Sequence, residues 1–110
     1  LFCEVVAGTR PGTILHRDEL VTAFRDLRPR APVHFLVVPN RHIPSAADLS
    51  AADADVLARM FVVARELAAA DGIADEGYRL VFNVGRDAGQ SVDHLHLHVL
   101  GGRRLSWPPG

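Results

Sequence analysis

The segment 93–100 constrains the fold most, because histidine and aliphatic residues alternate along it without interruption. Successive side chains of a β-strand point to opposite faces of the sheet. We therefore expect a strand over residues 94–100, with one face packed on the core and a row of imidazoles on the other. The core-facing residues are Leu95, Leu97 and Val99, and the outward-facing residues are His94, His96 and His98.

The rest of the chain has the composition of one folded domain. Its 110 residues are 48% hydrophobic and 23% charged, which suits a single core and argues against disorder. Twelve arginines face 13 acidic residues, so the basic excess typical of a nucleic-acid-binding protein is missing. No apolar run approaches the roughly 20 residues of a membrane helix. Cys3 has no second cysteine to pair with, so we expect a reducing compartment, the cytoplasm.

Periodicity and turn residues predict five strands and one long helix within a single domain, 1–110. Apolar residues recur at helical spacing after Ser50, a residue type that caps helix N-termini, and Gly72 is the expected stop. A helix on one face of a mostly antiparallel sheet makes an α+β fold. The predicted strands cover residues 13–16, 20–24, 33–39, 78–84 and 94–100.

Three imidazoles on one strand face favour nucleophilic chemistry. The ordinary pKa of histidine is near 6.5, so much of a histidine population is neutral at pH 7 and carries a lone pair on one ring nitrogen. Such a nitrogen can attack a carbonyl or phosphorus centre and form a covalent intermediate. His96 is best placed, because it has a histidine on each side to orient it or to pass protons. The glycine-rich loop 85–91, with the Ser91 hydroxyl, has the composition of an anion site.

Two other interpretations of these histidines stay open. They could be ordinary residues on a solvated strand face, or they could bind zinc. His94 and His98 would lie about 13 Å apart along a strand, so one zinc with bonds of about 2.0–2.1 Å would hardly collect all three. We expect no acidic cluster nearby to complete a metal site. His16 shows no recognisable role and is expected at the surface.

At these residues the chain resembles the histidine triad (HIT) family, whose signature is His-x-His-x-His followed by two apolar residues. It is most similar to the Hint-type branch, the purine nucleoside phosphoramidate hydrolases. The resemblance implies an α+β fold with a short N-terminal helix at 1–7, and a homodimer with a continuous ten-stranded sheet. Further matching pieces, in order, are Asp26-Leu27, the segment 31–39, Gly77-Tyr78-Arg79, Asn83, Gly89-Gln90-Ser91, and the ending 101–110 with Trp107-Pro108-Pro109-Gly110.

The resemblance also implies a role for each matching position. His96 would be the nucleophile, His98 would bind the α-phosphate, and His94 and His34 would belong to a supporting histidine network. Ser91 would contact the phosphate or the leaving amine. The implied nucleotide contacts are Asp26 at the ribose, Phe24 and Leu27 at the base, Asn83, Gly89 and Gln90 around the phosphate, and Trp107 toward the partner subunit's site.

The implied activity is hydrolysis of the P–N bond in AMP or GMP conjugates, with no metal required. The alternatives are reactions of dinucleoside polyphosphates, nucleotidyl transfer, a purine-nucleotide-binding regulatory module, and a zinc-binding structural protein. Some bacterial relatives hold zinc with a Cys-x-x-Cys pair and two histidines. Cys3, His42 and His94 match three of those positions, so zinc at a structural site is the metal alternative.

Overall fold

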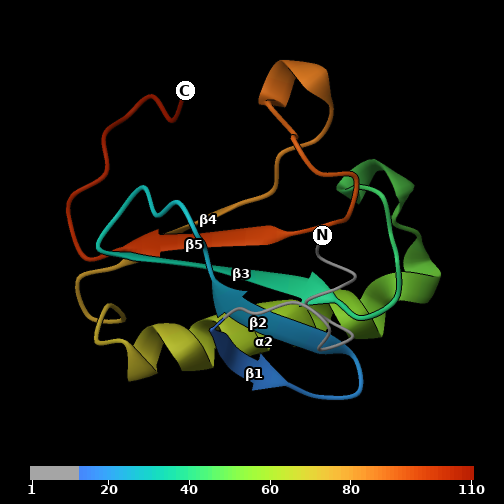
Figure 1. Ribbon diagram of the computed structural model, residues 1–110, viewed down its shortest axis with the longest axis horizontal. Coiled ribbons are helices and arrows are strands. Elements are labelled where there is room, and N and C mark those ends of the chain that lie inside the picture. Colours follow the sequence, from blue (N-terminus) through green and yellow to red (C-terminus); the bar gives the residue numbers. More distant parts are fainter. Residues whose placement is uncertain (1–12) are drawn as a thin grey trace.

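The computed structural model describes residues 13–110, which form one five-stranded antiparallel sheet in the order β1-β2-β3-β5-β4 (Figure 1). The predictions for a helix at 1–7 and for Cys3 lie outside these residues. The strands are β1 (Ile14–Arg17), β2 (Val21–Arg25), β3 (Val33–Pro39), β4 (Tyr78–Val81) and β5 (Leu97–Gly101). The helical elements are η1 (Ala46–Asp48), η2 (Ala51–Asp53), α2 (Ala54–Ala70) and η3 (Arg86–Ala88).

The long helix α2 crosses one face of the sheet (Figure 1). Ser50 and Asp53 form a capping box around the 3-10 turn η2, which leads directly into α2. Gly72, at φ +77°, follows the end of the helix in the left-handed conformation that glycine adopts without strain. The predicted helix between Ser50 and Gly72 is therefore confirmed, with a 3-10 first turn. Within residues 13–110, no helix is both long and apolar enough to cross a bilayer.

Apolar clusters lie on both faces of the sheet. The larger one fills the space between the sheet and α2, and it contains Leu95, Leu97 and Val99, as their alternation predicts. The smaller one lies on the opposite face, called the open face below because no long helix among residues 13–110 covers it. Its members are Phe24, Leu36 and Val38, with Val92 packed against them. The predicted α+β fold is confirmed, and the histidines share the face of the smaller cluster.

The last strand begins at Leu97 rather than at residue 94. Its hydrogen-bonded ladder with β3 cannot extend further, because Pro39 has no N–H to donate. The carbonyl of Pro39 accepts a hydrogen bond from His94 Nε2 at 3.0 Å. The N–H of Leu95 donates instead to the carbonyl of Ile43, at 2.6 Å. The alternation of faces continues back through Leu95 nonetheless, since that side chain remains in the core.

β3 has its predicted bounds, and the other strand bounds differ from the predicted ones by up to three residues. β4 ends at Val81 and not at residue 84, because its neighbour β5 offers ladder partners only as far as His98. β1 and β2 each lie one residue later than predicted. The carboxylate of Asp18 accepts the N–H groups of Leu20 and Val21 at 2.8 and 2.9 Å, so Leu20 belongs to the turn.

Candidate active site

The adjacent strands β3 and β5 bring the histidines together on the open face of the sheet. His98 lies opposite Leu36 in the ladder, and His34 is two residues away on the same face of β3. The ring centroids of His34 and His98 are 5.2 Å apart. His96 packs edge-on against His98, with centroids 4.9 Å apart. Three of the four histidines predicted for the site thus form one cluster.

Hydrogen bonds fix the tautomers of His34 and His98. The backbone N–H of Arg30 donates to His34 Nδ1 at 3.0 Å, so a neutral His34 carries its proton on Nε2. That Nε2–H donates to His98 Nδ1, also at 3.0 Å. A neutral His98 therefore carries its own proton on Nε2. The carboxylate of Asp26 lies 3.4 Å from His34 Nε2 and supports the same orientation.

The rings of His34 and His98, which are hydrogen-bonded in series and are called the histidine relay below, both favour the neutral form. Burial is the main reason that the pKa of His98 falls from 6.5 to about 4, and the neighbouring His96 and His34 add to the effect while Asp26 opposes it. Burial likewise lowers the pKa of His34, with Asp26 acting against it. At neutral pH, His98 Nε2 is therefore a hydrogen-bond donor on an uncharged ring.

His96 is held differently, by the main chain. Its Nδ1–H donates to the carbonyl of His94 at 2.7 Å, and a carbonyl can only accept. The lone pair of a neutral His96 ring is therefore on Nε2. His96 is only 6% exposed, so its ring has little freedom to turn. The neutral ring presents a nucleophilic nitrogen of defined identity beside His98.

His94 uses both of its ring nitrogens inside the protein. Nε2–H donates to the carbonyl of Pro39 at 3.0 Å, and Nδ1 lies 3.1 Å from Nδ1 of His42. Burial lowers the pKa of His94, although the bond to Pro39 opposes this. At 2% exposure, His94 serves to hold the chain at the start of the triad.

The glycine-rich loop after β4 satisfies several of its own amides, which differs from the expectation of a backbone anion site. The N–H of Gly85 donates to the Gln90 side-chain oxygen at 3.0 Å. The N–H groups of Gly89 and Gln90 donate to the carbonyls of Arg86 and Gly85, both at 3.0 Å. Because the 3-10 turn η3 uses these donors, an approaching anion would meet the exposed hydroxyl of the next residue, Ser91, rather than those amides.

The Gln90 side chain also ties this loop to its surroundings. Its amide nitrogen donates to the carbonyls of Pro44 and Val92 at 2.8 and 3.0 Å. Val92 packs against the smaller apolar cluster. The loop is thereby fixed above the open face of the sheet, on the side away from α2 (Figure 1).

Comparison with known proteins agrees with this geometry. The family model described as "HIT domain" matches residues 7–105, which is most of the chain. The chain belongs to the HIT family.

Several HIT relatives cover nearly all of the chain. The purine nucleoside phosphoramidase of Escherichia coli K12 is 47% identical over 105 residues, which are 96% of this chain and 88% of the relative. A HIT family hydrolase from Legionella pneumophila is 47% identical, with a TM-score of 0.98 over 100% of this chain and 98% of the other. A Zn-bound histidine triad family protein from Mycobacterium smegmatis is 32% identical, with a TM-score of 0.80 over 96% of this chain and 78% of that chain.

The remaining residues predicted for the HIT site differ in their exposure. Phe24 is buried in the smaller apolar cluster, and Asn83 is half-buried. Leu27 and Trp107 are 75% and 81% exposed, so neither is packed in the described chain. A cavity of about 330 Å³ lies beside Asp26 and His34. Its other lining residues are Arg25, Pro29, Pro32, Val33 and Asp71.

A metal-ligand cluster occurs where the sequence suggested none. One ligand atom each from Asp26, His34 and His98 lies within 4.8 Å of the others. The one acidic member of this cluster, Asp26, directly follows β2, and its N–H donates to the His34 carbonyl at the start of β3, at 3.1 Å. An ion bound here would replace the hydrogen bond between His34 and His98, and would therefore compete with the relay.

The predicted zinc residues fit a metal in part. A tetrahedral zinc with Zn–N bonds of about 2.0–2.1 Å holds two ligand nitrogens about 3.3 Å apart. The Nδ1 atoms of His42 and His94 lie 3.1 Å apart, close to that separation. Cys3, the third predicted ligand, is outside the described residues. Two histidines of this HIT protein are thus placed so that they could share a structural zinc.

Sequence reasoning missed the groups that orient the histidines, because most of them are backbone atoms. The N–H of Arg30 and the carbonyls of Pro39 and Ile43 carry no signal in residue type. His16, expected at the surface, is half-buried. Its Nε2 lies 2.7 Å from Asp18 and its side chain is 27% exposed.

Proposed function

We propose that this HIT protein hydrolyses the P–N bond of purine nucleoside 5′-monophosphoramidates through a covalent intermediate on His96. The observation that carries the proposal is the tautomer of His96. Its Nδ1–H is committed to the His94 carbonyl, which leaves the lone pair on Nε2 beside a proton-bearing His98 Nε2. The 47% identity to a purine nucleoside phosphoramidase supports the substrate class.

The first displacement forms an N–P bond and breaks the P–N bond of the substrate. The lone pair of His96 Nε2 attacks phosphorus, and the amine leaves with the electron pair of the broken bond. The amine must gain a proton as it leaves, and the Ser91 hydroxyl delivers it. His98 Nε2–H donates to a phosphate oxygen, where negative charge gathers in the transition state.

The second displacement returns the enzyme to its starting state. Water attacks the phosphorus of the nucleotidyl-histidine, and the bond to His96 Nε2 breaks. The water gives up a proton to the group that lost one in the first step, and a nucleoside monophosphate is released. The series of hydrogen bonds ends at the Arg30 backbone N–H, which does not give up its proton. His34 therefore orients His98 and keeps the His98 proton on Nε2, and it supplies no proton itself.

The nucleotide would lie across the open face of the sheet. We assign the ribose hydroxyls to the Asp26 carboxylate, which borders the cavity of about 330 Å³. Phe24, from the smaller apolar cluster, and the exposed Leu27 would contact the purine. Asn83 and Ser91 would contact the phosphate, and Gly89 and Gln90 would shape the loop around it.

Turnover of adenosine 5′-phosphoramidate carrying a fluorescent amine tests the proposal. We expect the wild-type protein to release AMP and amine in equal amounts, and His96→Asn to lose turnover while it still binds AMP by calorimetry. Retained turnover in His96→Asn would contradict the mechanism. Tight AMP binding without any wild-type turnover would favour the regulatory-module alternative. A higher kcat/KM for a diadenosine polyphosphate than for the phosphoramidate would favour the alternative that the protein hydrolyses dinucleoside polyphosphates.

We also propose that the protein acts as a homodimer joined along β4. This strand is at the edge of the sheet, and its Leu80 is 39% exposed. Phe61 from α2 is 40% exposed, and its ring packs edge-on against Phe82, just after β4. Pairing two copies of β4 would complete both edges and bury these side chains. The exposed Trp107 would then reach toward the partner's site. Sedimentation of wild type and Leu80→Arg tests this, with the variant expected to be monomeric.

The chemistry assigned to His96, His98 and Ser91 needs no metal. We propose zinc only as a structural ion with His42 and His94 as ligands. Dialysis against a chelator should leave kcat unchanged and lower the melting temperature if a structural zinc is removed. Loss of kcat with an unchanged melting temperature would instead indicate a catalytic metal.

A further inference from the structure

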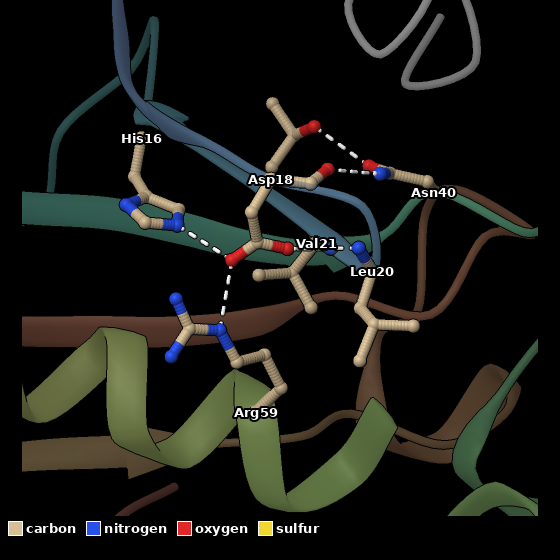
Figure 2. A network of polar contacts seen from close by, with 7 residues as sticks. His16, Asp18, Leu20, Val21, Asn40 and Arg59 are labelled. Atoms are coloured by element: carbon tan, nitrogen blue, oxygen red, sulfur yellow. Dashed lines mark hydrogen bonds and ion pairs between the residues drawn. The ribbon is translucent and has the colours of Figure 1, made fainter. Parts of the chain in front are cut away.

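The turn between β1 and β2 is built around the carboxylate of Asp18 (Figure 2). One oxygen accepts the N–H groups of Leu20 and Val21, at 2.8 and 2.9 Å. The other lies 2.7 Å from His16 Nε2 and 2.8 Å from Arg59 Nε, which comes from α2. The four contacts outweigh the opposing effect of burial and hold the pKa of Asp18 well below its usual range. The turn is therefore fastened both to β1 and to the helix.

The turn between β1 and β2 also holds Asn40, the residue that follows β3 (Figure 2). The side-chain amide of Asn40 donates to the Asp18 carbonyl at 2.7 Å, and the Asn40 N–H donates to the Leu20 carbonyl at 2.8 Å. The Asn40 side-chain oxygen accepts the hydroxyl of Thr22, also at 2.7 Å. Thr22 is fully buried. Both ends of the Asn40 amide and its backbone N–H thus have fixed partners.

The residues on either side of Asn40 hold the start of the histidine triad. The carbonyl of Pro39 accepts His94 Nε2–H at 3.0 Å, and the carbonyl of Ile43 accepts the N–H of Leu95 at 2.6 Å. His94 in turn presents the carbonyl that accepts His96 Nδ1–H. Hydrogen bonds, joined by the backbone between Asn40 and Pro39, therefore connect the turn to the ring of the proposed nucleophile.

We propose that Asn40, locked by Thr22 and by the Asp18 turn, is a positioning residue that keeps His96 in the tautomer with its lone pair on Nε2. Neither Asn40 nor Thr22 touches the reacting atoms. Asn40 acts on His96 through segment 39–43 and His94, and Thr22 acts through Asn40. The kinetic consequence rests on the proposed function, whereas the tautomer itself does not.

The pair Thr22→Val and Thr22→Ser tests the proposal. Valine has nearly the shape of threonine but lacks the hydroxyl that Asn40 accepts, and serine keeps it. We expect Thr22→Val to lower kcat for the phosphoramidate about tenfold, with KM and AMP affinity within about twofold, and Thr22→Ser to keep most of kcat. Val63→Ala, a truncation in the core under α2, is the control for a general loss of melting temperature.

Ring-nitrogen NMR of histidine-labelled protein supplies a readout that does not depend on turnover. At alkaline pH, where the rings are neutral, His96 should report protonated Nδ1 in wild type and Thr22→Ser. It should shift toward protonated Nε2 in Thr22→Val and in a second variant, Asp18→Asn, which keeps an acceptor for Leu20 and Val21. An unchanged His96 signal in both variants would overturn the proposal, as would the same shift in Val63→Ala. If the wild-type protein does not turn over the phosphoramidate but the NMR result is the expected one, only the proposed function is refuted.

Discussion

His96 and His98 are neighbours with ring centroids 4.9 Å apart, yet the protein orients them by different means. A main-chain carbonyl, that of His94, holds His96. A side chain, His34, holds His98, and His34 is itself set by the Arg30 N–H. One ring of the pair thus depends on the path of the backbone and the other on a series of titratable groups.

The difference corresponds to the two tasks that the mechanism requires. A nucleophile needs a lone pair that stays on one atom, and a carbonyl acceptor enforces this without any group that can change its charge. A hydrogen-bond donor to the phosphate needs its proton on the outward nitrogen, and the neighbouring His34 imidazole keeps it there. The His96 side should therefore respond to changes in backbone position, and the His98 side to changes in side-chain chemistry and pH.

The largest expected effect after loss of the nucleophile comes from His98→Ala. It removes the donor assigned to the phosphate oxygen, and loss of one such donor costs about 100- to 1,000-fold in kcat. Steady-state kinetics on the phosphoramidate would measure the loss. A decrease of less than about tenfold would show that other groups stabilise the phosphate charge.

The variant His34→Leu should have a smaller effect, about tenfold in kcat, because it leaves His98 in place but removes the partner that sets its tautomer. The control is His34→Gln, whose amide can still donate to His98 Nδ1 and should keep more of kcat. Equal loss in both variants, measured together with AMP affinity, would argue that His34 acts only through packing.

The titration of His98 should make the free energy of unfolding of the protein depend on pH. The pKa of His98 is lowered to about 4 in the folded protein, from 6.5, chiefly by burial. The unfolded chain therefore binds more protons between these values, and the free energy of unfolding should rise as pH increases from about 4 to 6.5. One group contributes at most about 1.4 kcal/mol per pH unit.

Chemical denaturation across this pH range would measure the effect. His98→Asn keeps an acceptor for His34 Nε2–H but cannot titrate, so its unfolding free energy should rise less steeply with pH. A slope identical to that of wild type would mean that His98 is not the group responsible.

The smallest expected effect is that of Arg103→Ala. Arg103 Nη2 donates to the Arg30 carbonyl at 2.9 Å, which braces the residue whose N–H orients His34. Because the contact is exposed, we expect a decrease of only about threefold in kcat. Arg104→Ala changes the same charge next to it and should have no effect. Equal kcat for the two variants would show that the brace is unimportant.

The features that the sequence predicted correctly are those that depend on residues close together along the chain. Alternation placed Leu95, Leu97 and Val99 in the core, and the capping residue Ser50 marked the start of the helical segment. These signals are strong because each depends on neighbours along the chain. The α+β class followed from them.

The groups that complete the site depend on contacts between distant parts of the chain, which the sequence does not record. β5 starts late because Ile43 takes the N–H of Leu95, and Asp26 approaches His98 only through the fold. The exposed Leu27 and Trp107 would gain contacts from a nucleotide or a second subunit. Their roles therefore stay predictions.

Rapid mixing with an adenosine phosphoramidate, followed by a quench into base and mass spectrometry of the protein, tests the central claim most directly. Bonds between phosphorus and imidazole survive in base, so a covalent intermediate can be mapped to a residue. We predict an adenylyl adduct on His96 that appears within one turnover, decays as AMP forms, and is absent from His96→Asn. An adduct on another residue, or AMP formed in the first turnover with no adduct at any time, would contradict the account.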